Sequence, residues 1–201
     1  MDKPALTELP LLEPIGKRWS PRAFAERPVE DEKLCLLFEA ARWTASSRNE
    51  QPWRYLVARR QDPAAFGRML DCLIASNRDW AQRAGALILT VAKLAFDYKQ
   101  LPNLHAYHDV GQASAAMAIQ ATALGLFIHQ MAGFEPARAI ETYGIPEGFY
   151  PVSVIAVGYP GDPALLSEKQ QAWELAPRKR RPLVEIVFAD SWGSSAEFDG
   201  S

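Results

Sequence analysis

The sequence predicts one main domain of the α+β class, and three observations support this. Apolar residues recur at helical spacing in several segments, and two continuous apolar runs have the length of buried strands. These helices and strands do not follow the regular alternation of a doubly wound fold. A chain of 201 residues can bury most of its apolar surface without disulfides.

The first part of the chain is expected to pass from an extended arm into a helix. Residues 1–17 contain three prolines and no sustained period, so they should run extended over the surface. Asp31 can cap a helix whose apolar residues fall at i, i+3, i+4 and i+7, namely Leu34, Leu37, Phe38 and Ala41. The polar residues 44–51 end this helix, and Pro52 biases Gln51 away from helix.

Short helices and strands follow. Residues 53–58 alternate as in a strand, and Pro63 suits the first turn of a helix over 63–73. A second short helix around 77–83 leads into the apolar run 86–91, which is typical of a buried strand.

The strongest helix prediction covers residues 109–124. Ala113, Met117, Gln120 and Leu124 share one face, and the alanines with Ser114 allow close approach by another helix. The later elements are a short strand or turn over 126–131, a helix over 136–143, a buried strand over 151–158 and a last strand over 183–188.

Composition excludes several classes of protein. Lys+Arg minus Asp+Glu is 22 − 24 = −2, which gives no bulk positive field for nucleic acid. The longest apolar run, residues 84–92, is far shorter than the roughly 20 residues that span a bilayer. The N-terminus lacks the basic start and apolar core of a signal peptide. Cys35 and Cys72 are expected to be small buried residues in a reducing compartment, so we expect a cytoplasmic protein.

Two basic segments are candidates for an anion site. Arg18, Ser20 and Arg22 lie within five residues, and guanidinium groups match phosphate oxygens. The run 178–181 (RKRR) offers a second clamp from far along the chain, although it also suits a nuclear-localisation patch. Either segment can equally be a solvated basic surface.

Two further segments suit a planar heterocycle. Residues 45–53 (ASSRNEQPW) place several hydroxyl, amide and guanidinium groups in a loop between a helix and a strand. The alternative is turn formation and helix capping, which favour the same residue types. Residues 129–134 (HQMAGF) form a small turn whose glycine lets backbone N–H groups approach a ligand; the alternative is a simple connection.

Other chemistry finds no support. His105 and His108 are three residues apart, but no cluster of Cys or carboxylates completes a metal site. A G-x-S-x-G elbow, a G-x-G-x-x-G loop and a Walker A motif are all missing from the sequence. We therefore expect no bound metal and no nucleophilic triad.

Taken in order, these segments resemble the FMN-dependent nitroreductase family over residues 15–190. The resemblance rests on RxSxR, SSxNxQPW, a helix ending in GL, HQMAGF, VIAVGYPGD and a basic RxRxP segment. It implies a nitroreductase-like α/β sandwich with a mixed, mainly antiparallel central sheet flanked by helices. It also implies an intertwined homodimer with an FMN at each interface.

The resemblance also implies roles for individual residues. Arg18, Ser20 and Arg22 would hold the flavin phosphate, ribityl chain and ring edge, with Arg178 and Arg180 as a C-terminal phosphate clamp. A loop reaching the flavin from the partner subunit would supply Ser46, Ser47, Arg48, Asn49 and Gln51. The turn of Met131, Ala132 and Gly133 would bring backbone amides to flavin N5. Asn77 matches a position near the pyrimidine end of the ring, and Trp80 stands where some relatives place a cation.

The implied activity is NAD(P)H oxidation coupled by ping-pong to reduction of nitroaromatics, quinones or similar acceptors. No catalytic side chain is required, because the flavin carries the chemistry. Other reactions on this scaffold are enone reduction, dehalogenation and flavin fragmentation, and a non-catalytic flavin-binding module is a further alternative. Residues 93–107 would cover the flavin.

The domain organisation expected from the resemblance has three parts. Residues 1–17 form an N-terminal arm, 18–182 the FMN-binding domain, and 183–201 a C-terminal extension that wraps the partner and ends in flexible residues. Both ends are rich in apolar residues but weakly periodic, which suits wrapping over a partner. The alternative is packing on their own subunit.

Overall fold

The fold is built around a four-stranded antiparallel sheet, seen in a computed structural model that describes residues 3–198. The strand order is β1 (Trp53–Arg59), β2 (Ala86–Lys93), β4 (Phe149–Gly158) and β3 (Phe127–Met131). The register runs from Trp53 opposite Ala92 to Arg59 opposite Ala86 between the first pair. β2 and β4 lie at the centre, which explains their continuous apolar sequences.

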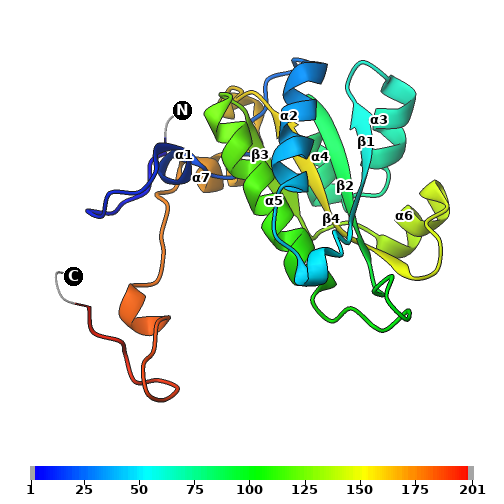
Figure 1. Cartoon of the computed structure of the whole chain (residues 1–201). Coiled ribbons are helices and arrows are strands. Elements are labelled where there is room, and N and C mark those ends of the chain that lie inside the picture. The colour runs from blue at the N-terminus through cyan, green and yellow to red at the C-terminus, as the bar shows by residue number, and fades with distance from the viewer. Residues whose placement is uncertain (1–2, 199–201) are drawn as a thin grey trace.

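Helices cover both faces of this sheet (Figure 1). One face carries α3 (Pro63–Leu70), α4 (Ala75–Ala81) and α6 (Pro136–Tyr143), and the other carries α2 (Asp31–Arg42) and α5 (Ala106–Ala123). Alternate residues of β2 enter the two cores: Leu87 and Leu89 face the first, whereas Ala86 and Ile88 face the second. The α+β class and the helix-flanked, mainly antiparallel sheet are therefore confirmed, although the sheet is not mixed: all three strand pairs of the described residues are antiparallel.

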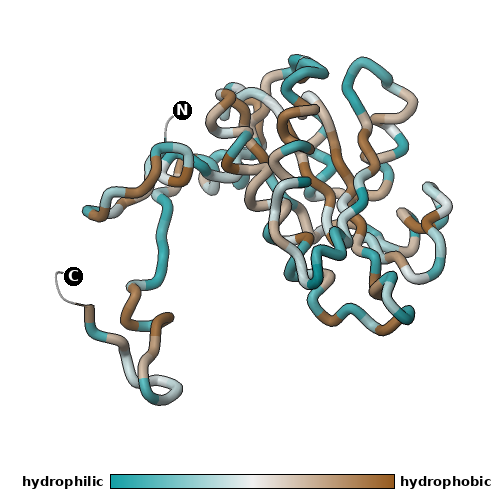
Figure 2. The backbone as a smooth tube through the Cα atoms, in the orientation of Figure 1, coloured by the Kyte–Doolittle hydropathy of each residue, from teal (hydrophilic) through white to brown (hydrophobic). Residues whose placement is uncertain are grey.

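The N-terminal arm meets residues 174–178 beside the sheet, where Arg178 bonds the carbonyls of Lys3 and Gly16. α1 (Glu13–Lys17) contacts α5, and α7 (Glu168–Leu175) precedes the basic run at 178–181. Beyond it, the chain leaves the body and carries apolar stretches with it (Figures 1 and 2). Trp192 is 93% exposed there, and Leu6 in the N-terminal arm is 78% exposed. Among the described residues, no helix is long and apolar enough to cross a membrane.

The last predicted strand is wrong. Leu183–Glu185 forms a 3-10 turn, in which the N–H groups of Ile186 and Val187 bond the carbonyl of Leu183. A strand needs a neighbour to pair with, and this segment has left the sheet. Phe188 makes only an isolated bridge with Ser195.

Three smaller expectations also need correction. The N-terminal arm is not extended throughout, because α1 forms after Pro4 and Pro10, with Pro14 in its first turn. Asp31 is the first helical residue and makes no capping bond; Glu30 occupies the cap position. Cys35 is exposed because it points away from the buried stripe of α2, whereas Cys72 is buried as expected. Residues 199–201, part of the expected flexible end, lie outside the described residues.

Candidate functional site

The two basic segments meet in one cavity. Arg18, Ser20 and Arg22 line a hollow of about 230 Å³ together with Arg178 and Arg180, from more than 150 residues further along the chain. None of these four arginines forms an ion pair within the described residues. Trp19 also lines the cavity, and its buried indole N–H has no hydrogen-bond partner in the described chain. The cavity therefore has a surplus of donors suited to an anion.

Electrostatics show that these cations crowd one another. Burial lowers the pKa of Arg18 from its ordinary value, and the nearby Arg180 lowers it further. The pKa of Arg178 is lowered by burial, and then by Arg18 and Arg180. Lys3 joins the cluster, and burial lowers its pKa although Glu174 acts in the opposite direction. An incoming anion would relieve this repulsion.

Glu174 on α7 anchors the segment 18–22, and it was not predicted from the sequence. Its side chain is buried, and its carboxylate accepts hydrogen bonds from the backbone N–H groups of Arg22 and Ala23 at 2.9–3.1 Å. These three bonds fix the backbone at Arg22 and Ala23 and engage no arginine side chain, and the side chains of Arg18 and Arg22 line the cavity. A glutamate in a polar helix gives no sequence signal of this role.

His129 is a second unpredicted anchor of the same segment. Its Nδ1 lies 2.8 Å from the carbonyl of Pro21, which can only accept, so Nδ1 carries the proton. The ring also lies against Trp80, with centroids 4.6 Å apart. Burial is the main reason that the pKa of His129 falls to about 4. The imidazole is consequently neutral near pH 7 and acts as a fixed hydrogen-bond donor.

The loop of residues 46–51 lies at a different place. Arg48, Asn49 and Gln51 are exposed and have positive φ angles of 55°, 55° and 50°. One polar side chain of the loop bonds within the loop itself, since Ser46 Oγ accepts the N–H of Gln51 at 2.9 Å. The buried carboxylate of Asp109 on α5 accepts the backbone N–H of Ser47 at 3.0 Å. Asp109 is a further anchor that the sequence did not reveal.

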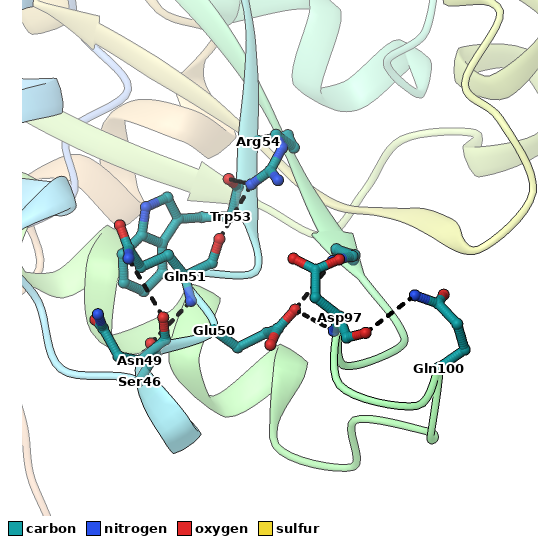
Figure 3. A network of polar contacts seen from close by, with 9 residues as sticks. Ser46, Asn49, Glu50, Gln51, Trp53, Arg54, Asp97 and Gln100 are labelled. Atoms are coloured by element: carbon teal, nitrogen blue, oxygen red, sulfur yellow. Dashed lines mark hydrogen bonds and ion pairs between the residues drawn. The ribbon is translucent and has the colours of Figure 1, made fainter.

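A network of polar contacts joins this loop to the segment after β2, where Glu50 meets Asp97 (Figure 3). Lys93 donates to Glu50 at 2.9 Å and also bonds the carboxylate of Asp97. These bonds hold the pKa of Lys93 above its ordinary value, chiefly through Asp97. The loop is thus tied to the segment that follows β2.

The turn after β3 meets Asn77. Met131 is buried, Ala132 is exposed and Gly133 is half-buried. Asn77 Nδ2 donates to the carbonyl of Gly133 at 2.9 Å, and a Cβ on Gly133 would lie only 2.5 Å from that nitrogen. Glycine is therefore required here for close packing by Asn77. Trp80 is 1% exposed and belongs to the core of this chain.

The predicted site residues form separate groups within one chain. Ser46 and Ser47 line a cavity of about 300 Å³ with the first turns of α5, including Asp109 and Gln112. Arg18 and Ser20 also line a cavity of about 290 Å³ against Ala115 and Ala118, further along the same helix. Residues 109 and 118 are about 14 Å apart along an α-helix. His105 and His108 line the first of these cavities, and the described residues contain no group of three or more possible metal ligands.

Comparison with known proteins decides the family. A model of the nitroreductase family matches residues 15–159. The chain belongs to the nitroreductase family. This membership confirms the predicted family, the fold class and the expectation of an enzyme.

Relatives of this nitroreductase agree in sequence and structure. A crystal structure described as an oxidoreductase containing FMN is 30% identical, has a TM-score of 0.88, and the match covers 94% of this chain and 96% of that one. A protein of Archaeoglobus fulgidus, named provisionally as an NADH dehydrogenase/NAD(P)H nitroreductase, is 28% identical over 75% of this chain and 86% of its own. An uncharacterized 15.4 kDa protein of Mycolicibacterium smegmatis is 34% identical over 61% of this chain and 81% of its own.

Proposed function

We propose that the chain is an FMN-dependent NAD(P)H oxidoreductase that reduces nitroaromatics, quinones or similar electron-poor acceptors by ping-pong hydride transfer. The observation that carries the proposal is the cavity in which Arg18, Arg22, Arg178 and Arg180 converge without an ion-pair partner among the described residues. A phosphate ester is dianionic near neutral pH, and guanidinium groups bind it by charge-assisted hydrogen bonds. Bound FMN would supply the hydride-transfer chemistry between NADH or NADPH and the acceptor.

The residues around this cavity would hold the phosphate end of the cofactor. Arg22 sits on backbone fixed by Glu174, Arg18 and Ser20 precede it along the same segment, and Arg178 and Arg180 approach from the other chain end. Arg178 uses Nη1 for the carbonyls of Lys3 and Gly16, which leaves its other N–H groups for a ligand.

The remaining predicted residues would contact the ring. The loop residues Ser46, Ser47, Arg48, Asn49 and Gln51 would reach it from the partner subunit. Ala132 and Gly133, which follow β3, and Asn77 on α4, which bonds Gly133, would contact its other edge; Met131 at the end of β3 is buried.

A homodimer would bring these groups together. In one chain, the pair Arg18 and Ser20 and the loop line separate cavities at different turns of α5. The stripe of Gly111, Ala115 and Ile119 on this helix leaves a small, apolar face with its first two residues exposed, which suits a second helix. The exposed apolar residues of both chain ends would cover the partner, as expected of an extension over 183–201.

Cofactor binding tests the proposal most directly. The purified protein should be yellow, and anaerobic addition of NADH or NADPH should bleach it until a nitroaromatic or quinone restores the colour. A colourless protein that does not bind added FMN would contradict the proposal. A yellow protein that no nicotinamide reduces would favour a flavin-binding module, and turnover of enones alone would favour a different chemistry on the same fold.

A matched pair of variants tests the cavity. Arg18→Gln should weaken FMN binding by roughly tenfold or more, since a charge-assisted hydrogen bond is lost. Arg59→Gln is the control, because Arg59 is held by Asp31 at 2.8 Å in an exposed pair on β1. Fluorescence titration measures the FMN dissociation constant of both variants. Equal values in the two would show that Arg18 does not bind FMN.

Truncation tests the dimer. Removing residues 182–201 keeps Arg178 and Arg180 but deletes the exposed extension, so dimer content and flavin occupancy should fall together. Sedimentation and absorbance measure the two quantities. A truncated monomer that still holds FMN tightly would show that the partner subunit is not needed.

A further inference from the structure

We propose that Glu50 is a positioning residue that fixes the loop of residues 46–51 to the segment of residues 94–104, called here the cover segment. The proposal rests on the FMN site proposed above, where the loop contacts the ring and the cover segment lies over it. It adds a residue that makes no contact with the flavin itself. Glu50 would set the spacing between these two walls of the site.

The contacts of Glu50 link the two segments directly. Its side chain is only 8% exposed, and that of Lys93 is 13% exposed. One carboxylate oxygen, Oε1, accepts from Lys93 Nζ at 2.9 Å and from the backbone N–H of Asp97 at 2.8 Å (Figure 3). A single buried oxygen therefore holds the end of β2 and the start of the cover segment against the loop.

Backbone hydrogen bonds within the cover segment close it into one turn. It folds back on itself, with the N–H of Phe96 bonding the carbonyl of Leu101 at 2.8 Å and that of Asn103 bonding Leu94 at 2.7 Å. Lys93 also bonds the carboxylate of Asp97. Because the turn is closed internally, a contact at Asp97 orients the whole segment.

Backbone strain is concentrated in the same two segments. The described chain has six non-glycine residues with positive φ, and five of them lie here: Arg48, Asn49, Gln51, Lys99 and Gln100. Such conformations cost free energy and persist where the surrounding contacts determine them. Glu50 stands between Asn49 and Gln51, so its buried carboxylate is placed to hold the strained loop.

A cation–π contact supports the same alignment. The guanidinium carbon of Arg48 lies 5.9 Å from the ring centre of Phe96 and 5.7 Å from that of Tyr98. Both aromatic residues belong to the cover segment. The loop therefore contacts the cover segment through the buried carboxylate of Glu50 and also through the exposed guanidinium of Arg48.

Three variants and a control test the proposal: Glu50→Gln, Lys93→Met, both together, and Glu13→Gln. Glu13 pairs with Lys17 in an exposed i,i+4 ion pair, so its variant removes a charge of the same kind from the surface. The first readout is hydrogen exchange of amides 95–101 in FMN-free protein. The second is the FMN dissociation constant with the absorption spectrum of the bound flavin.

We expect exchange of amides 95–101 to accelerate about tenfold in Glu50→Gln and to stay within about twofold of wild type in Glu13→Gln. Lys93→Met should have the larger effect, because it leaves a buried carboxylate without its cation, and the double variant should lie closer to wild type than Lys93→Met. FMN binding should weaken by about tenfold in Glu50→Gln, with a shifted flavin spectrum.

Unchanged exchange in Glu50→Gln would overturn the link between the two segments. Faster exchange with unaltered FMN affinity and spectrum would overturn the positioning role. If the wild-type protein binds no FMN, the proposed function fails together with the flavin part of this proposal. The exchange experiment then still decides separately whether Glu50 links the loop to the cover segment.

Discussion

The arginine cavity and the loop of residues 46–51 hold polar side chains in place by different means. Backbone at the cavity is fixed by two groups from distant elements, the buried Glu174 carboxylate and the half-buried, neutral His129 ring. Backbone at the loop is left-handed at three residues and is held by Asp109 and the Glu50–Lys93 pair. The cavity is therefore built into the core, whereas the loop depends on a few local contacts.

This difference predicts where substitutions act. At the cavity, loss of an anchor should lower the stability of the whole domain, because α7 and β3 hold the segment 18–22. At the loop, loss of an anchor should change local motion and leave global unfolding nearly unaltered.

The largest effect is expected for Glu174→Ala. It leaves the N–H groups of Arg22 and Ala23 buried without an acceptor, so the free energy of unfolding should fall by roughly 3–5 kcal/mol. Urea unfolding measures the change. The control is Glu141→Ala on an exposed face of α6, which should stay close to wild type. A small loss in Glu174→Ala would mean that the cavity is not built into the core.

A pH-dependent effect is expected at His129. The pKa of this ring falls from 6.5 to about 4 in the folded protein, so the folded state prefers neutral imidazole. The unfolded chain binds the proton first as pH falls, and up to about 3 kcal/mol of stability should disappear between pH 6.5 and 4.

His129→Gln keeps an N–H donor but cannot titrate, so the decline in stability over this pH range should be shallower. Exposed His105 is the control, and His105→Gln should retain the wild-type slope. Denaturant midpoints measured from pH 4 to 7 compare the three proteins. Parallel slopes in all of them would rule out His129 as the source.

The smallest global effect is expected for Asp109→Asn in the loop region. A neutral amide is a weaker acceptor for the N–H of Ser47, so the free energy of unfolding should fall by about 1 kcal/mol or less. The backbone amide of Ser47 should exchange several-fold faster. Hydrogen exchange at Ser47 and urea unfolding separate the local effect from the global one. Glu147→Gln, at an exposed position, is the control. A global loss as large as that of Glu174→Ala would erase the contrast between the two regions.

Local sequence patterns determined most of the elements around the site. The helix over 136–143 has the predicted bounds, because Pro136 starts it and Gly144 ends it with a φ of 58°. The apolar runs of β2 and β4 required burial on both faces, which only the centre of a sheet provides. Where pairing was needed, as for residues 183–188, an apolar sequence was insufficient.

The sequence by itself marked the arginine segments and the loop as candidate binding residues, because similar residue types cluster there and the segments follow a recognisable order along the chain. Only the tertiary structure decided that Arg178 and Arg180 share a cavity with Arg18 and Arg22, and that the loop lines a different cavity at the start of α5. The anchors Glu174 and His129 bond partners 151 and 108 residues away. An acid or a histidine leaves no local trace of such a contact, because burial and hydrogen bonding are set by the packing of distant elements.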